Sequence, residues 1–308
     1  VEILIDQMED DEPINNCMLT LSRALRPAIV PEDGNVLVVG DWSSIEARAL
    51  PWLSNSPEAE ERLNIFREEG DIYQHTADKI RQDRQVGKVT ELALGYGGAK
   101  GAFNAMAQNY NVYLPDARVK VIVDTWRREN AWAEVFWNTL ERAGKQAIAS
   151  PGVQFEAGKV SYIFYRDLID GTLVCTLPGG ATIQYPRAKL EDQETEYGPR
   201  TVITALKANW KPAAGERDWP RVTLWRGLLA ENVTQAFCAA LLRRGIDRCL
   251  HADIPVIAHV HDEIVAEVAD KDAKDVKRKL QEIMEEVPSW GRGLPLSAKP
   301  TIMKRYGK

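Results

Sequence analysis

The stretch VLVVGDWSSIEARAL, residues 36–50, joins an apolar run to a helix-like segment through an acid. Its first part is rich in β-branched residues, which predicts a buried strand from Val36 to Asp41. The second part predicts a short helix that ends near Pro51. The strand therefore ends on a carboxylate, and a second acid, Glu46, follows on the first turn of the helix.

Two interpretations of these acids fit the stretch taken alone. The simpler one is a capping box, in which Ser43 caps the helix and Glu46 bonds back to the amide of the cap. Asp41 would then be an ordinary acid at a strand end. In the functional alternative, Asp41 is an exposed carboxylate on a rigid strand end, where a metal ion could sit.

The composition is that of a soluble globular protein with room for one large or two ordinary domains. The chain has 308 residues, of which 44% are hydrophobic and 27% are charged. Apolar runs stay well short of the roughly 20 residues that span a bilayer, so we expect no membrane partner. The net charge of −6 is mild evidence against a protein that mainly grips phosphate backbones. The chain starts at Val1, so we expect it to be processed or cut from something longer.

The four cysteines are far apart in the sequence and form no CxxC pair. This spacing indicates free thiols in a reducing cytoplasm, with neither a disulfide framework nor a zinc site. They are Cys17, Cys175, Cys238 and Cys249.

The periodicity of the sequence changes several times along the chain. Residues 56–148 have helical spacing, whereas about 152–226 alternates with period two in KVSYIFYRD, GTLVCTLP, ATIQYP and RTVITALKA. A strong helix over 228–251 and a charged amphipathic helix from Lys271 to Glu286 flank a hairpin, IPVIAHV-HDE-IVAEV. A helical block between strand-bearing halves indicates an α+β fold in which one subdomain interrupts another.

Two acids, Asp262 and Glu263, interrupt the predicted hairpin. Asp is a normal turn residue, but the apolar flanks would place this charge near the core, which is costly without a cation or partner. His259 and His261 on one face of the strand also leave a metallohydrolase open. That reading lacks ligands elsewhere, because His75 and His251 are the remaining histidines.

A third pattern, RQDRQVGKVTELALGYGG at 81–98, repeats every four residues. Arg84, Lys88, Leu92 and Tyr96 would form a stripe on one helix. A solvated basic face explains Arg84 and Lys88, but a tyrosine before Gly97-Gly98 is less usual on a plain surface.

Together and in this order, the three patterns resemble the polymerase core of family A DNA polymerases, particularly bacteriophage members. Motif A of that family is similar to residues 41–48, motif B to the 84–97 stripe, and motif C to His261-Asp262-Glu263. A Gln-bearing helix before motif C resembles Glu231-Asn232-Val233-Thr234-Gln235. The resemblance runs from about residue 20 to the C-terminus.

The resemblance implies template-directed DNA synthesis by two-metal phosphoryl transfer, with Asp41, Asp262 and Lys88 as catalytic residues. Two Mg²⁺ ions would be held by Asp41 and Asp262, with the carbonyl of Trp42 and the auxiliary acid Glu263. The incoming nucleotide would contact Arg84, Lys88, Leu92, Tyr96 and Glu46, and Lys88 could protonate the pyrophosphate. DNA would contact Gln235, His261 and Arg48. Leu92 departs from the pattern, since an aromatic residue is usual there.

The resemblance also implies a division of the chain. Residues 1–55 and 227–308 would be an antiparallel palm, 56–151 helical fingers, and 152–226 a hairpin-rich fingers tip. The thumb and the exonuclease would be absent, so an N-terminal polymerase fragment or subunit is an expected partner, beside primer–template DNA and deoxynucleotides. The expected location is the cytoplasm, that of the bacterial host for a phage protein. The alternative is a non-catalytic accessory or DNA-binding subunit built on a polymerase core.

Overall fold

The structure, a computed structural model, describes residues 21, 24–195, 198–209, 211, 215 and 217–307. The chain divides into two compact units. The first unit combines residues 1–43, 241–286 and 296–308, and the second unit combines 44–240 and 287–295. One unit is thus inserted into the sequence of the other, as the pattern of strands and helices predicts.

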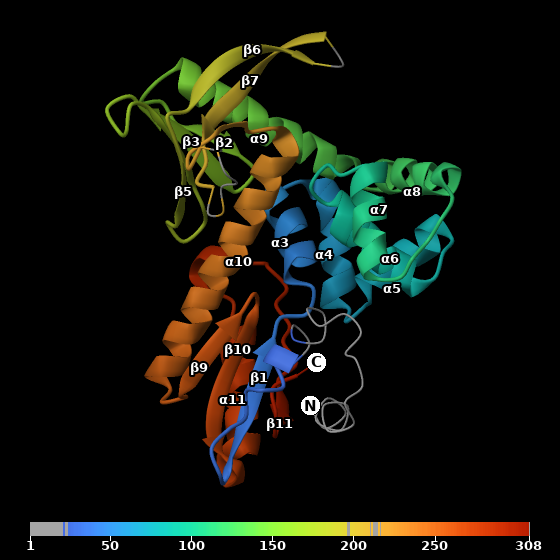
Figure 1. Cartoon of the computed structure of the whole chain (residues 1–308), viewed down its shortest axis with the longest axis vertical. Coiled ribbons are helices and arrows are strands. Elements are labelled where there is room, and N and C mark those ends of the chain that lie inside the picture. Colours follow the sequence, from blue (N-terminus) through green and yellow to red (C-terminus); the bar gives the residue numbers. More distant parts are fainter. Residues whose placement is uncertain are drawn as a thin grey trace. The chain divides into compact units, whose positions relative to one another are not determined.

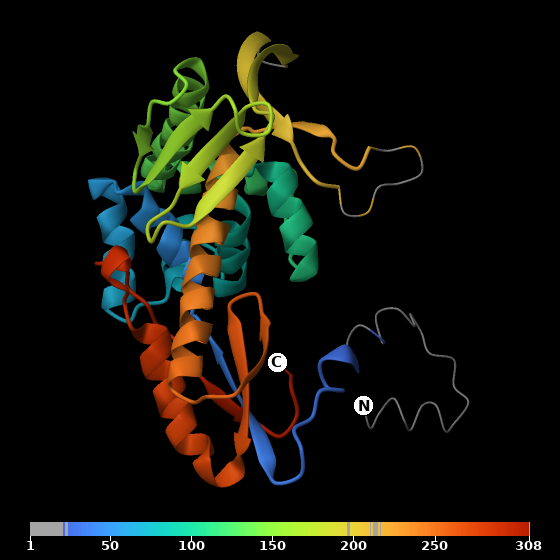
Figure 2. The same cartoon turned by 90° about the vertical axis from the view of Figure 1, so that its left-hand side faces the viewer.

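The first unit is built on a four-stranded antiparallel sheet (Figures 1 and 2). The strand order is β11-β1-β10-β9. The strands are β1 (Asn35–Asp41), β9 (Val256–Val260), β10 (Glu263–Ala269) and β11 (Thr301–Met303). A 3₁₀ turn, η2 (Asp270–Asp272), leads from β10 into helix α11 (Ala273–Glu285), which packs on β1.

Strand β1 lies inside the sheet, between β11 and β10, and its residues are buried on both faces. Leu37 and Val39 pack in a cluster with Val265 of β10 and Tyr306. The other face meets α11 so closely that a Cβ on Gly40 would lie 2.7 Å from the Sδ of Met284. Gly40 therefore allows the strand to approach the helix just before Asp41.

The second unit contains seven consecutive helices and two sheets. The helices are α3 (Ile45–Ser54), α4 (Glu60–Arg67), α5 (Ile72–Ile80), α6 (Arg84–Leu94), α7 (Lys100–Asn109), α8 (Asp116–Glu129) and α9 (Ala131–Ala149), with 3₁₀ turns η1 (Pro57–Ala59) and η3 (Ser289–Gly291). Helix α10 (Arg226–His251) contributes residues to both units.

Both sheets of the second unit are antiparallel. One has the order β2-β3-β4-β5 and consists of β2 (Phe155–Ala157), β3 (Val160–Tyr165), β4 (Thr172–Thr176) and β5 (Thr182–Pro186). The other consists of β6 (Lys189–Thr195), β7 (Gly198–Leu206) and β8 (Arg221–Thr223). Helix α9 packs on β2 and β3. Four of these strands match the segments that alternate with period two; β2, β6 and β8 were not predicted.

The structure departs from the sequence patterns at three points. Helix α3 does not end near Pro51 but continues to Ser54, because Trp52 and Leu53 are buried and hold its last turn. The helical spacing of residues 56–148 is interrupted at Asn130, which separates α8 from α9. Strand β9 is not fully buried: it is an edge strand of its sheet, and Ile257 is 49% exposed.

Among the residues that the structure describes, Cys175, Cys238 and Cys249 form no disulfide, and Cys17 lies outside those residues. Within the described part of the chain, no helix combines the length and apolarity needed to cross a membrane.

A buried polar network braces α6 inside the second unit. The Glu91 carboxylate forms an ion pair with Arg62 of α4, and its side chain is 5% exposed. The same carboxylate accepts hydrogen bonds from Thr76 Oγ1 of α5 at 2.6 Å and from Trp126 Nε1 of α8 at 2.8 Å. Arg62 also donates to Asn130 Oδ1 at 2.8 Å. One carboxylate thus links α6 to three other helices and fixes its rotation.

We predict that Gly40→Ala lowers the free energy of unfolding by about 1–3 kcal/mol, because the added methyl group overpacks the contact between β1 and α11. The measurement is denaturant unfolding of purified protein. Gly101 of α7 is a matched control, since a Cβ there meets nothing within 4 Å. Gly101→Ala should be neutral or stabilising. Equal destabilisation by both substitutions would contradict the packing account.

We predict that Glu91→Gln lowers the free energy of unfolding by about 3–5 kcal/mol, because it breaks a buried ion pair and leaves the Arg62 charge uncompensated. Glu60 is the control. It pairs with Arg67 on the surface, where the two side chains are 53% and 37% exposed. Glu60→Gln should change stability by less than about 1 kcal/mol. Similar small losses in both variants would show that the network does not brace α6.

Candidate functional site

The sheet of the first unit brings three predicted acids to one end. Asp41 is the last residue of β1 and pairs with Glu263, the first residue of β10. Asp262 lies directly before Glu263, in the turn that joins β9 to β10. Residues paired across an antiparallel ladder share a face, so Asp41 and Glu263 project to the same side of the sheet. The hairpin is therefore what gathers acids that are far apart in sequence.

Hydrogen bonds hold the chain just after Asp41. The buried Trp42 donates from Nε1 to the Met284 carbonyl at 2.7 Å, and its backbone bridges Ala298. The Ser43 amide donates to the Ser297 carbonyl at 2.8 Å. The side chain of Trp42 is therefore part of the core, while its backbone is held in place beside the acids.

The residues of the turn differ in exposure. His261 is exposed and has a left-handed backbone with φ of 55°, and Asp262 is half-buried. Glu263 is only 2% exposed and accepts a hydrogen bond from Tyr306 Oη at 2.6 Å. His261 lies beyond the end of β9, so it does not share a strand face with His259 as expected. Within the described ranges, no three His, Cys, Asp or Glu side chains form a ready-made metal cluster.

The predicted motif B stripe lies on the accessible side of α6, with Tyr96 just beyond the helix end. Arg84 is exposed, and Lys88, Leu92 and Tyr96 are half-buried. The other side of the helix is buried and contains Val86, Gly87, Val89, Thr90, Ala93 and Leu94. The stripe is therefore available to a ligand, whereas the opposite face anchors the helix.

Both cations of the stripe contact groups of this unit. Arg84 Nε is 2.6 Å from Asp71 Oδ2, and its guanidinium carbon is 5.4 Å from the centre of the Tyr73 ring. Lys88 Nζ is 4.8 Å from the centre of the Tyr110 ring. Burial alone would raise the pKa of Asp71, but hydrogen bonds from Arg84 and from the amides of Gln74 and Tyr73 lower it. A phosphate group would have to compete with this carboxylate for Arg84.

Tyr96 and Glu46, both predicted to contact the nucleotide, form a hydrogen bond with each other. Tyr96 Oη donates to Glu46 Oε2 at 2.6 Å. Burial and the adjacent Glu46 carboxylate keep the pKa of Tyr96 well above its usual value, so the phenol stays protonated and donates. The capping-box interpretation is wrong: Ser44 is the N-cap of α3, and no side-chain hydrogen bond caps the helix. Its left-handed backbone, φ 52°, starts the helix one residue later than the box requires.

The structure places the two predicted DNA contacts of this unit differently. Gln235 is exposed on α10. Arg48 is 6% exposed, stacks its guanidinium 4.2 Å from the centre of the Phe66 ring, and donates from Nη1 to the Pro295 carbonyl at 3.0 Å. The side chain of Arg48 therefore packs inside the unit, and its contact with DNA stays a prediction.

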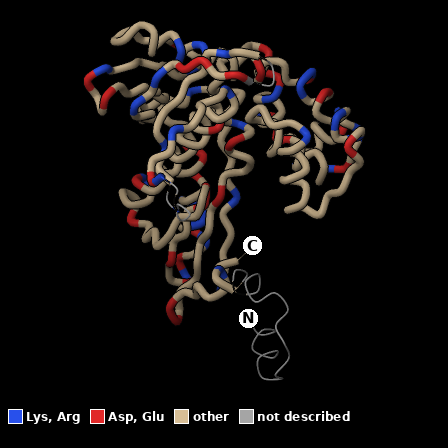
Figure 3. The backbone as a smooth tube through the Cα atoms, turned by 45° about the horizontal axis from the view of Figure 1, so that its top comes forward, with Lys and Arg blue, Asp and Glu red and all other residues tan. Residues whose placement is uncertain are grey.

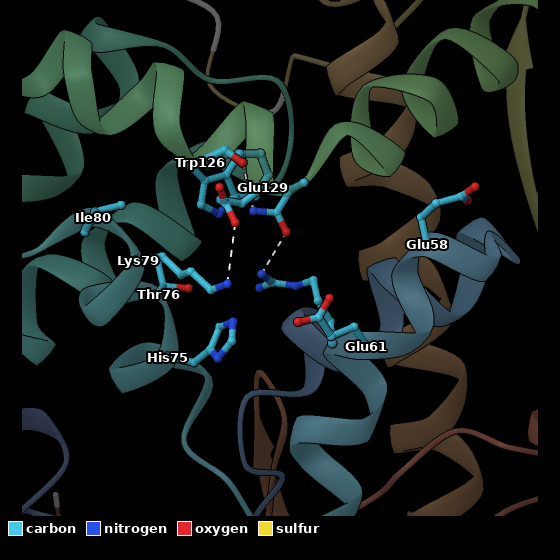
Figure 4. A pocket seen from close by; sticks show the side chains of 10 residues that line it. Glu58, Glu61, His75, Thr76, Lys79, Ile80, Trp126 and Glu129 are labelled. Carbon is cyan, nitrogen blue, oxygen red and sulfur yellow. Dashed lines mark hydrogen bonds and ion pairs between the residues drawn. The ribbon is translucent and has the colours of Figure 1, made fainter.

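Among the described residues, neither the charge distribution in Figure 3 nor the pocket in Figure 4 adds a binding site to those predicted. Figure 3 shows Lys and Arg interspersed with Asp and Glu along much of the chain. The polar pocket in Figure 4 is lined by residues that include His75, Thr76 and Lys79, and it contains none of the predicted site residues. Burial, with the cations of Arg62 and Lys79 nearby, lowers the pKa of His75, which favours its neutral form.

The predicted site residues thus form two groups. The first unit holds Asp41, Trp42, His261, Asp262 and Glu263, and the second unit holds Glu46, Arg48, Arg84, Lys88, Leu92, Tyr96 and Gln235. Sequence reasoning missed the partners of these residues: Asp71, Tyr110 and Tyr306. Asp71 carries a local signal, because it caps α5 by accepting from the Tyr73 and Gln74 amides. Tyr306 carries none, because its contact with Glu263 spans 43 residues.

Two of three comparisons with known proteins found similar proteins. No protein-family model matches the chain. It is 33% identical over 300 residues to a DNA polymerase of Bacillus phage SP02. The aligned residues cover 94% of this chain and 44% of that polymerase. The chain therefore spans less than half the length of this curated relative.

A solved structure shares the fold. It is the POL domain of Pol1 from M. smegmatis in complex with DNA primer–template and dNTP, with a TM-score of 0.57 and 15% identity over 95% of this chain and 43% of that one. This likeness confirms the predicted α+β polymerase fold. We conclude that the chain is related to a phage DNA polymerase and has a polymerase-domain fold.

Proposed function

We propose that the chain carries the nucleotide-adding part of a family A DNA polymerase, which extends a primer 3′ end on a DNA template. The observation that carries this proposal is the pairing of β1 with β10, which brings Asp41 and Asp262 to one end of a sheet. The relationship to the phage polymerase and the accessible stripe on α6 support it. Primer–template DNA and deoxynucleotides are the proposed ligands, since the related solved structure contains both.

The donor set at the sheet end fits Mg²⁺. Asp41 and Asp262 would hold the metal, with the Trp42 carbonyl as a further ligand. Mg²⁺ is commonly bound through one or two carboxylates plus water and substrate phosphates, so the lack of a ready-made cluster among the described residues suits it. A pair of such ions would neutralise charge on the attacking and leaving oxygens of phosphoryl transfer.

The side chains of α6 would bind the triphosphate. Arg84 would exchange its Asp71 partner for phosphate oxygens, which a guanidinium can bind in a bidentate manner. Lys88 would bind as a compact cation and donate a proton from Nζ to the departing pyrophosphate oxygen. Leu92 would face the sugar without the ring that is usual there, and Gln235 and His261, both exposed, would contact DNA near the primer end.

We further propose that full activity requires the rest of a polymerase, supplied by a longer chain or by a separate polypeptide. The phage relative has more than twice the length that this chain matches. The site of action would be the cytoplasm of a bacterial host. The alternative, an accessory protein without catalysis, remains an outcome of the test below.

We predict that Asp41→Asn and Asp262→Asn each abolish primer extension with Mg²⁺ and leave the unfolding midpoint nearly unchanged, because each removes a metal-binding charge at a strand end. Asp270 is a matched control: it is exposed at the opposite end of β10. Asp270→Asn should extend primers like the parent. Binding of Mn²⁺, followed by electron paramagnetic resonance, should weaken in the first two variants alone.

Near-normal extension by either active-site variant would show that the assignment of metal ligands is wrong. A parent chain that extends no primer with or without a supplied N-terminal polymerase fragment, yet binds primer–template, would favour the accessory protein.

We predict that Glu46→Ala raises the ratio of ribonucleotide to deoxyribonucleotide incorporation by about tenfold or more. The carboxylate, held by Tyr96, would close the space beside C2′ of the sugar and exclude a 2′-hydroxyl. A free-energy penalty of more than about 1.4 kcal/mol for that hydroxyl corresponds to a tenfold or larger change in the ratio. Single-nucleotide insertion of each sugar form measures it. Glu58→Ala, on a neighbouring exposed turn, is the control. An unchanged ratio with a lower melting temperature would leave Glu46 a structural residue only.

A further inference from the structure

The second acid of the predicted motif C, Glu263, is built into the interior of the first unit. Its side chain is 2% exposed, although it starts a strand at the sheet end where the other acids are accessible. A buried carboxylate is costly unless hydrogen-bond donors face it. Tyr306 Oη supplies one at 2.6 Å, which is at the short end of the normal range for such bonds.

Tyr306 is itself held in place from several directions. It is 3% exposed and packs against Leu37, Val39 and Val265 of the sheet. Its amide donates to the Ile29 carbonyl at 3.0 Å, and the Arg26 guanidinium carbon lies 5.6 Å from the centre of its ring. The phenol is therefore a fixed donor, set by packing and by its backbone.

The Tyr306–Glu263 hydrogen bond is connected through the backbone to the two proposed metal ligands, Asp41 and Asp262. Glu263 is the residue after Asp262 and the ladder partner of Asp41. Its side chain points to the face on which Tyr306 lies, so fixing the carboxylate also fixes the strand residue that ends the turn. The turn needs such support, because His261 has a left-handed backbone with φ of 55°.

We propose that Tyr306 is a positioning residue: through the Glu263 carboxylate it sets the His261–Asp262 turn opposite Asp41, and Glu263 serves this purpose in place of ligating metal. The catalytic consequence rests on the proposed function, whereas the structural part does not. It replaces the expectation from the resemblance that Glu263 is an auxiliary metal ligand.

A single substitution can distinguish the two possible roles of Glu263, which are to accept the Tyr306 hydrogen bond and to ligate a metal ion. A glutamine at this position can still accept the tyrosine hydrogen bond through its amide oxygen but is a poor ligand for a hard cation. Glu263→Gln should therefore retain the turn and the Mg²⁺ requirement of the parent. Tyr306→Phe removes one hydroxyl and keeps the ring that packs against the sheet.

The test combines hydrogen exchange, unfolding and kinetics on the full chain. In Tyr306→Phe, amides of residues 261–263 should exchange about tenfold faster, because a lost buried hydrogen bond of ordinary strength has that effect. The control is Tyr113→Phe, whose side chain is 77% exposed and whose exchange should match the parent. Primer extension by Tyr306→Phe should show a several-fold lower kcat with an unchanged KM for deoxynucleotide.

Two further measurements complete the test. The shifts in unfolding midpoint caused by Tyr306→Phe and Glu263→Gln should not add in the double variant, as expected for groups in contact. The Mg²⁺ concentration for half-maximal extension should be the same for Glu263→Gln and parent. An increase of about tenfold or more in that concentration would show direct ligation and overturn the proposal.

Unchanged exchange at 261–263 in Tyr306→Phe would also overturn it. If the parent proves inactive even with a supplied N-terminal polymerase fragment, the proposed function fails, while exchange and the unfolding cycle still decide whether Tyr306 sets the turn through Glu263.

Discussion

The register of β1 against β10 is the constraint on which the first unit depends. With Asp41 opposite Glu263, alternate residues of β1 pack against Tyr306 on one face, and Gly40 meets α11 on the other. A slip of one residue would exchange the two faces. It would turn Asp41 toward α11 and force a side chain into the space that only Gly40 fits. Core packing and the placement of the acids are therefore specified by the same pairing.

The second unit keeps support and recognition on different sides of α6. Buried residues hold one face against other helices, the Glu91 ion pair braces the helix beside that face, and the accessible face carries the cations. Arg84 and Lys88 are restrained by Asp71 and by an aromatic ring, so their positions are limited before any ligand arrives. A preorganised cation loses less side-chain freedom on binding than a free one.

Local patterns predicted much of this, because local physics decides them. The apolar run before Asp41, the hairpin around Asp262 and the four-residue repeat on α6 are each set by neighbours in sequence. The resemblance named both Tyr96 and Glu46, and the structure joins them by a hydrogen bond. Contacts between segments that are distant in the sequence could not be predicted from such patterns.

Those distant contacts explain what the sequence patterns could not predict. No pattern around residue 48 shows that Phe66 and the Pro295 carbonyl will enclose the Arg48 guanidinium. Burial of Trp52 and Leu53 outweighs the helix-ending tendency of Pro51, which propensity alone cannot reveal. Likewise, Tyr306 looks like any aromatic residue until the sheet brings it to Glu263.

The insertion of one unit into the sequence of the other has a consequence for biosynthesis. The side chains of Asn35 and Glu267, near the far end of the β1–β10 ladder, join residues 232 apart in the chain. During translation β1 leaves the ribosome long before its partner exists, so VLVVG remains an unpaired apolar strand while the inserted unit is made. The entropy cost of closing so long a loop grows only with the logarithm of its length. Pairing between segments so far apart in the sequence is nevertheless slow. The strand that carries Asp41 is thus the segment most in need of protection from aggregation while the chain is being synthesised.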